Sequence, residues 1–140
     1  MRLVRMGFIV IVAVIGYAST ILAQEISIDQ IIADAQISGF VQGLKPNEYA
    51  NYKVVVYVET DRWYIHPYAG QGENRSWASI TENGAWQIQT VRRQFSANKV
   101  AAVLVKRDYP EPNRTENILN IPHRAIVIRE LRGTEEYGRL

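Results

Sequence analysis

The sequence of 140 residues contains no cysteine, and this absence excludes several classes of protein. The chain cannot be a disulfide-rich scaffold, and it has no thiolate ligand for zinc and no thiol nucleophile. Histidine is scarce as well, because His66 and His123 are the only two and each stands beside a proline. Two imidazoles do not complete a metal site without a third ligand, so we expect no metal and no other cofactor.

Recognisable catalytic patterns are also lacking. The G-x-S-x-G motif that presents a nucleophilic serine does not occur. Glu59 and Asp61 are two residues apart and would share a face of a continuing strand, an arrangement that glycoside hydrolysis could use. Asp61 is explained more simply as a turn residue, because aspartate favours turns. We therefore expect a protein without enzymatic activity.

Long uncharged segments are missing except at the start of the chain. Arg2 and Arg5 precede residues 6–23, which carry no charge and end in the small residue Ala23. This order of basic, apolar and small residues is typical of a secretory signal peptide at 1–23. The alternative is an uncleaved anchor, because eighteen uncharged residues reach the lower limit for crossing a bilayer. We expect a secreted, periplasmic or cell-envelope protein, with no membrane association unless this segment is retained.

Outside residues 1–23, the chain has no excess of positive or negative charge. The whole chain has sixteen basic and fourteen acidic residues. Because Arg2 and Arg5 lie in 1–23, which has no acidic residue, the rest of the chain has fourteen of each. Nucleic-acid binding needs a basic face on the folded domain, so we expect no nucleic-acid partner.

About 117 residues follow the predicted cleavage site, enough for one domain with a core of its own. We expect an N-terminal segment at 24–36, a main domain at 37–132 and a flexible tail at 133–140. In the N-terminal segment Ile28, Ile31, Ile32 and Ala35 fall on one helical stripe. A short helix and a loose segment both fit this pattern, and we expect either to lie outside the main core.

From residue 37 onward the apolar residues recur with the period of two that is typical of strands. We expect strands at 37–43, 52–58, 63–66, 77–80, 85–90, 100–105 and 124–131. Six or seven short strands without a long helix predict an all-β, antiparallel β-sandwich of the immunoglobulin-like or fibronectin-like kind, or a partly closed barrel. The sequence specifies no oligomeric state.

Three local patterns refine this expectation. The segment 52–58 is apolar on both faces, which predicts a central strand. Gly39 and Gly43 in the first strand indicate a bulge or a close approach of the backbone. Asn83-Gly84 predicts a hairpin turn that joins 77–80 to 85–90.

The order of motifs between Val54 and Pro112 resembles a bacterial β-sandwich module with the pattern VVVYxxTDxWYxxPY…DGTW…AAxLVxxxYxPP. The matching segments are Val54-Val55-Val56-Tyr57-Val58, Thr60-Asp61-Arg62-Trp63-Tyr64-Ile65, Pro67-Tyr68, Asn83-Gly84-Ala85-Trp86, Ala101-Ala102-Val103-Leu104-Val105 and Tyr109-Pro110-Glu111-Pro112. Such modules occur beside secreted polysaccharide-active enzymes and in exported parts of membrane proteins. The resemblance implies an accessory domain and supplies no binding residues. The chain departs from the pattern at Glu111, and at Arg92 and Arg93.

Aromatic side chains are the remaining candidates for function. Trp86 and Trp63 alternate with other apolar residues, so we expect them in the core. Tyr64, His66 and Tyr68 then lie on the opposite face, and Trp77 borders a polar loop at 69–76. We expect these four residues to form an exposed ligand-binding patch. The function that fits it is recognition of a polysaccharide or cell-envelope glycan; the alternative is a structural or protein–protein interaction module with an envelope protein as partner.

The signal-peptide hypothesis predicts where the exported protein begins. We expect N-terminal sequencing of exported material to give Gln24 as the first residue, because cleavage after Ala23 follows the small-residue region. Recovery of intact Met1 in a membrane fraction would show instead that the segment is retained as an anchor.

Overall fold

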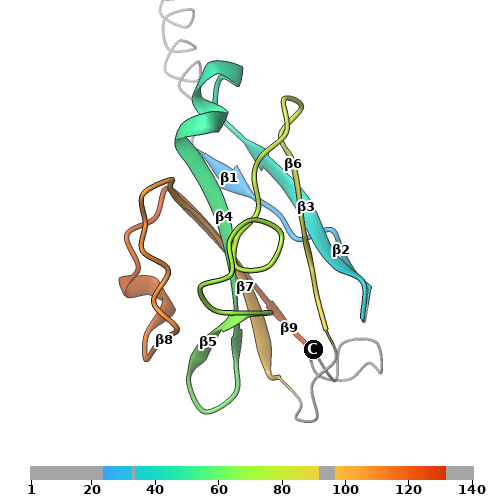
Figure 1. Cartoon of the computed structure of the whole chain (residues 1–140), viewed down its shortest axis with the longest axis vertical. Helices are drawn as coiled ribbons and strands as arrows, with labels where there is room; N and C mark the ends of the chain where they lie inside the picture. The colour runs from blue at the N-terminus through green and yellow to red at the C-terminus, as the bar shows by residue number, and fades with distance from the viewer. Residues whose placement is uncertain (1–23, 33, 92–96, 132–140) are drawn as a thin grey trace, which may run out of the picture.

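The computed structural model describes residues 24–32, 34–91 and 97–131. They form two antiparallel β-sheets with almost no helix, which confirms the mostly-β class (Figure 1). The strands are β1 (Glu25–Ile26), β2 (Gln30–Ile32), β3 (Gln36–Gln42), β4 (Tyr52–Glu59), β5 (Trp63–His66), β6 (Ala85–Gln89), β7 (Lys99–Lys106), β8 (Arg114–Thr115) and β9 (Ala125–Glu130), with short 3-10 helices η2 (Pro46–Asn51) and η3 (Ile118–Asn120).

The predictions for 1–23 and 133–140 lie outside the described residues. Within the described part, no helix is long and apolar enough to cross a membrane.

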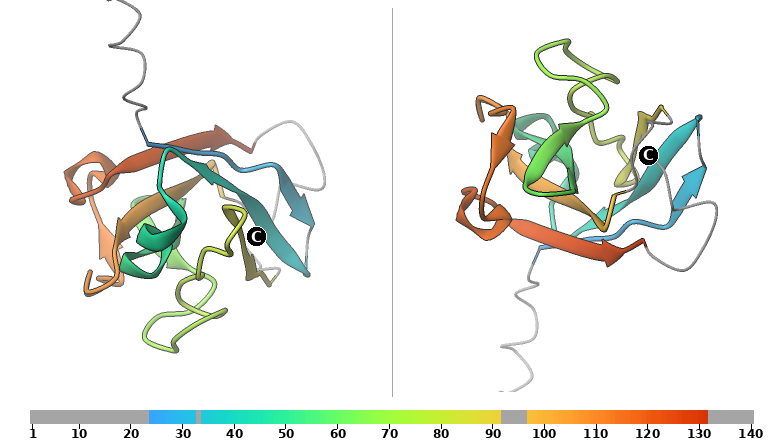
Figure 2. Two further views of the ribbon diagram at one scale, coloured as in Figure 1. Left: turned by 90° about the horizontal axis from the view of Figure 1, so that it is seen from above. Right: turned by 90° about the horizontal axis from the view of Figure 1, so that it is seen from below.

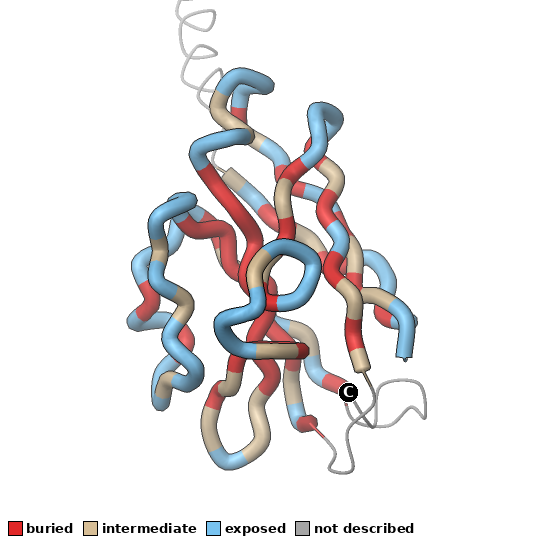
Figure 3. The backbone as a smooth tube through the Cα atoms, viewed as in Figure 1, coloured by how far each residue is buried: buried red, intermediate tan, exposed pale blue. Residues whose placement is uncertain are grey.

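Strand β4 lies at the centre of a five-stranded sheet ordered β8-β5-β4-β7-β9. It pairs with β7 along its whole length, from Tyr52 opposite Lys106 to Glu59 opposite Lys99. Every residue from Tyr52 to Val58 is buried, so the prediction of a central strand apolar on both faces is confirmed. Figure 3 shows this strand as a continuous buried segment.

The two faces of this sheet are covered by different layers. On one face, Val54, Val56 and Val58 belong to a core shared with the other sheet. On the other face, Val55 and Tyr57 belong to a second core that the segment 106–124 closes, mainly with Ile118 and Ile121 of the η3 region. The five-stranded sheet is therefore buried on both sides, and its strands have few positions left to face solvent.

The second sheet has β3 at its centre, with β6 on one side and β1 and β2 on the other. The pairing of β3 with β1 and β2 shifts by one residue between Ile26 and Gln30, so residues 27–29 form a bulge. Opposite this bulge, a Cβ atom on Gly39 would overlap the backbone carbonyl of Ser27. The close backbone approach that the glycine predicts is confirmed.

The expectation that 24–36 forms a helix or a loose segment outside the core is wrong. Ile26, Ile28 and Ile31 are buried in the core between the sheets. The bulge explains why this segment resembles a helix in sequence. Buried residues in a strand are two apart, but the extra residue of the bulge places Ile28 and Ile31 three apart, which is a helical spacing. The two sheets meet along this segment, where β1 runs beside β9 (Figure 2) and the Arg129 side chain donates a 2.9 Å hydrogen bond to the Ile28 carbonyl.

The Asn83-Gly84 turn forms, but it does not close the expected hairpin. Gly84 has a φ of 90°, and its N–H donates to the Thr81 carbonyl at 2.9 Å. The segment 77–80 does not pair with β6, because Ala78 bridges Val54 of β4 instead. The turn thus carries the chain from one sheet to the other, and β6 finds its partner in β3.

The buried position of Trp86, which is 2% exposed, confirms that it is a core residue and generates a stability prediction. Trp86→Ala should lower the free energy of unfolding by about 3–5 kcal/mol, as large aromatic truncations do. Trp86→Phe should cost much less, because it keeps a ring and removes an indole N–H that has no hydrogen-bond partner among the described residues. Urea unfolding of both variants measures the difference. Equal midpoints for wild type and Trp86→Ala would contradict the packing described here.

Candidate functional site

The sequence-predicted patch of Tyr64, His66, Tyr68 and Trp77 is not reproduced as one exposed surface. His66 is 2% exposed, and its Nε2 lies 2.5 Å from the Oγ1 of Thr90, so the expectation that it faces outward is wrong. The reason is the double covering of the five-stranded sheet. Trp63 and Ile65 of β5 face the second core, so His66 on the alternate face points toward the space between the sheets.

The other three members of the patch are half-buried, and each contacts a charged side chain. The Trp77 ring has Lys53 at 5.3 Å and Arg107 at 4.6 Å from its centroid. The Tyr68 ring has the Arg75 guanidinium at 5.4 Å. A hydrogen bond from Tyr64 lowers the pKa of the exposed Asp61. The role of these rings in ligand binding stays a prediction, and their charged partners would compete with a stacking sugar.

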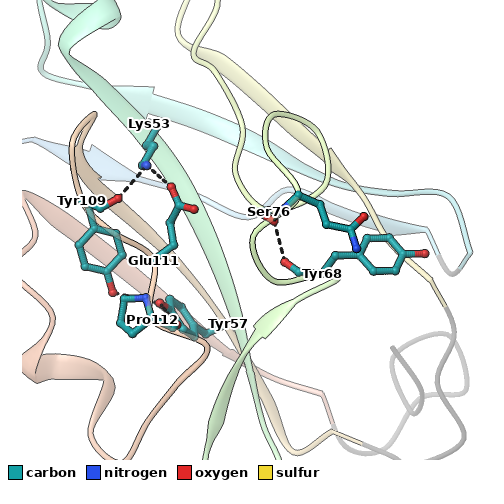
Figure 4. Close-up of polar contacts among 8 residues, drawn as sticks. Lys53, Tyr57, Tyr68, Ser76, Tyr109, Glu111 and Pro112 are labelled. Carbon is teal, nitrogen blue, oxygen red and sulfur yellow. Dashed lines mark hydrogen bonds and ion pairs between the residues drawn. The ribbon is translucent and has the colours of Figure 1, made fainter.

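The loop at 69–76 is held by its own hydrogen bonds. Ser76 is fully buried; its hydroxyl donates to the Tyr68 carbonyl at 2.9 Å and accepts from the Gln71 N–H at 2.7 Å (Figure 4). The Asn74 N–H donates to the Trp77 carbonyl at 2.7 Å. These bonds give the loop a fixed shape, and loops fixed on a rigid scaffold are where binding groups concentrate.

A groove of about 770 Å³ lies between this loop and the four-stranded sheet. The sheet contributes residues that alternate with core residues and so face away from the core, among them Ser38 and Phe40 of β3 and Gln87 of β6. The bulge before β2 adds Asp29 to the same lining, and Gln30 at the start of β2 follows it. The sheet side of the groove therefore carries amide, hydroxyl and carboxylate groups beside the exposed ring of Phe40 and the buried ring of Trp86.

The opposite side of the groove comes from the loop and the segment that follows it. Glu73, Asn74, Ser79 and Thr81 line it there. None of the residues that line the groove, all of which lie in the described part of the chain, is a lysine, arginine or histidine. Its ionisable groups, Asp29 and Glu73, are thus both acidic.

Phe40 is the one large apolar side chain exposed in this groove, with 44% of its surface accessible. The sequence analysis does not identify Phe40 as a candidate, because it treats this residue only as part of the strand predicted at 37–43. A signal was present, since Phe40 shares a face with Ser38 and Gln42 and is the apolar exception on a polar stripe. An exposed aromatic ring among polar groups is typical of a contact surface.

A separate cluster of titratable groups lies on the far face of the five-stranded sheet. Lys53 forms an ion pair with Glu111, and its Nζ also donates to the Tyr109 carbonyl at 2.9 Å (Figure 4). The Tyr57 hydroxyl donates to the Pro112 carbonyl at 2.9 Å and lies 2.9 Å from the Tyr109 hydroxyl. The Lys53 side chain is 5% exposed and that of Glu111 is 15% exposed. These contacts fasten the segment 109–112 to β4.

Metal binding finds no support in the residues that the structure describes, which contain no cluster of three histidine, aspartate or glutamate side chains suited to an ion.

The Tyr57 environment predicts a loss of stability in alkali. Burial raises the pKa of Tyr57 well above its usual value of about 10. A raised pKa means that the stabilising contribution is complete below about pH 10 and is lost as the pH rises further. We expect the free energy of unfolding to fall between about pH 10 and 11, and to fall less steeply in Tyr57→Phe. Urea unfolding at pH 8, 10 and 11 tests this. Identical slopes in both proteins would contradict it.

No family model, no curated protein and no solved structure matches this chain. The resemblance to a bacterial accessory module therefore stays a prediction, and the groove is interpreted from its own side chains.

Proposed function

We propose that this chain is an exported, non-catalytic module that binds polysaccharide in the groove between the 69–76 loop and the four-stranded sheet. The observation that carries the proposal is the composition of the groove, in which amide, hydroxyl and carboxylate side chains surround the exposed ring of Phe40. The proposal includes cleavage of 1–23, location outside the cytoplasm, and classification of the two sheets as an immunoglobulin-like or fibronectin-like sandwich.

The chemistry of sugars matches these groups. A sugar hydroxyl both donates and accepts hydrogen bonds, and the side chains of Gln30, Asn74 and Gln87 offer both functions on one amide. The C–H face of a pyranose is apolar and flat, so it fits the ring of Phe40. The groove volume of about 770 Å³ lies within the range of about 300–1,000 Å³ that is usual for ligand sites.

The site also has a rigid frame. Phe40 and Gln87 stand on neighbouring strands, and Phe40 pairs with Ala85, two residues before Gln87. The buried hydroxyl of Ser76 fixes the loop that carries Asn74. Because these groups are already placed, binding would order few side chains, which favours affinity.

A second hollow supports the alternative of a protein–protein interaction module. It measures about 450 Å³ and is lined by Lys106, His123 and Arg124, with Tyr109 and Pro110 among its walls. Its basic and aromatic lining would suit an acidic peptide segment. We rank this function second because Asp108 also lines the hollow and reduces its positive charge.

The glycan proposal predicts that Phe40 contributes to retention on polysaccharide. Phe40→Ala should weaken binding by about 2- to 13-fold, since one aromatic contact contributes on the order of 0.5–1.5 kcal/mol beyond its buried area. The measurement is depletion of the purified protein by insoluble cellulose, xylan, chitin and mixed-linkage β-glucan. The matched control is Ile128→Ala, which truncates a comparably exposed apolar side chain on β9, outside the groove lining.

Two outcomes would contradict the proposal in different ways. Loss of retention in Tyr68→Ala or Trp77→Ala, with Phe40→Ala unchanged, would move the site to the aromatic residues that the sequence indicates. Absence of wild-type retention on every polysaccharide would favour the interaction module.

A further inference from the structure

We infer that the groove selects neutral polysaccharides and rejects polyanionic ones such as polyuronates. This inference rests on the proposed function and adds the class of ligand. It follows from the charges that line the groove, because Asp29 and Glu73 are the only ionisable side chains that the described residues contribute to its lining, and both are acidic. They stand on opposite sides, one on the bulge before β2 and the other on the 69–76 loop.

Four basic side chains from the described parts of the chain that stand near the groove contact other groups instead. Arg75, two residues from Glu73, lies over the Tyr68 ring and donates to the Gln71 side chain at 3.2 Å. The Arg129 side chain donates a hydrogen bond to the carbonyl of Ile28, the residue before Asp29. Arg129 does not line the groove. Lys53 and Arg107 stand over Trp77, which is packed against the second core. The carboxylates of Asp29 and Glu73 thus face the groove without a basic residue in its lining.

This charge pattern acts differently on the two kinds of glycan. A polyuronate carries a carboxylate on each sugar, and every carboxylate that enters the groove would be repelled from both sides. A neutral glycan meets no repulsion, and its hydroxyls can donate to the same two carboxylates in charge-assisted hydrogen bonds. Both acidic residues are exposed, so salt screens their field and the discrimination should be strongest at low ionic strength.

The test compares three proteins on two kinds of polysaccharide. Wild type, an Asp29→Asn/Glu73→Gln variant and an Asp61→Asn/Glu116→Gln variant are measured by affinity electrophoresis on neutral glycans (xylan, mixed-linkage β-glucan) and on alginate and polygalacturonate. The third protein is a matched control. It loses the same two charges, but from exposed residues outside the groove, so it separates a local effect from one of net charge.

We expect wild type to be retarded by neutral glycans and not by polyuronates at 50 mM salt. The Asp29→Asn/Glu73→Gln variant should gain about fivefold in affinity for polyuronates, since two screened repulsions at contact range are removed. Its affinity for neutral glycans should change less than about twofold, and the control should gain nothing on polyuronates.

Failure of this inference is distinguishable from failure of the proposed function. Equal or stronger wild-type binding to polyuronates, or an equal gain in the control variant, would overturn the charge selection and leave glycan binding in place. Absence of wild-type binding to every polysaccharide would overturn both.

Discussion

The structure depends on one constraint, which is that β4 and β7 are apolar on both faces. Seven consecutive residues of β4, from Tyr52 to Val58, are buried, and so are six of β7, from Val100 to Val105. Burial of this apolar surface is the dominant favourable term in folding. The five-stranded sheet therefore needs two covering layers, the other sheet on one side and the segment 106–124 on the other. The position of almost every other element follows from this requirement.

The double covering also decides which groups can meet a ligand. It places His66 between the sheets, packs Trp77 against the second core, and uses the Lys53–Glu111 ion pair to hold a covering segment in place. A buried ion pair of this kind is costly to break, because removing one partner leaves an uncompensated charge. The four-stranded sheet packs its core residues on one side, against the five-stranded sheet. Its outer face keeps polar residues that alternate with the core, and the groove lies there.

The groove combines features that come from distant parts of the chain. The bulge at 27–29 contributes Asp29 and requires Gly39 opposite, because a side chain on that residue would overlap Ser27. The crossing from Ala78, on the five-stranded sheet, to β6 places the loop beside Phe40. The proposal of a neutral, hydroxyl-rich ligand rests on the exposed ring of Phe40, the amides on both sides and the two acidic groups of the lining.

The sequence alone determined the mostly-β class, the central position of 52–58, the burial of Trp86 and the tight turn at Asn83-Gly84, because alternation, β-branching and turn chemistry are local signals. The partner of each strand was decided by tertiary structure. Residues 77–80 and 85–89 flank one turn yet join different sheets, and the bulge made a strand at 25–32 resemble a helix. Alternation shows that two faces differ but does not show which of them meets solvent. His66 was therefore expected on the surface and is buried, while Phe40 was passed over and is exposed, because burial depends on which layer packs against each face.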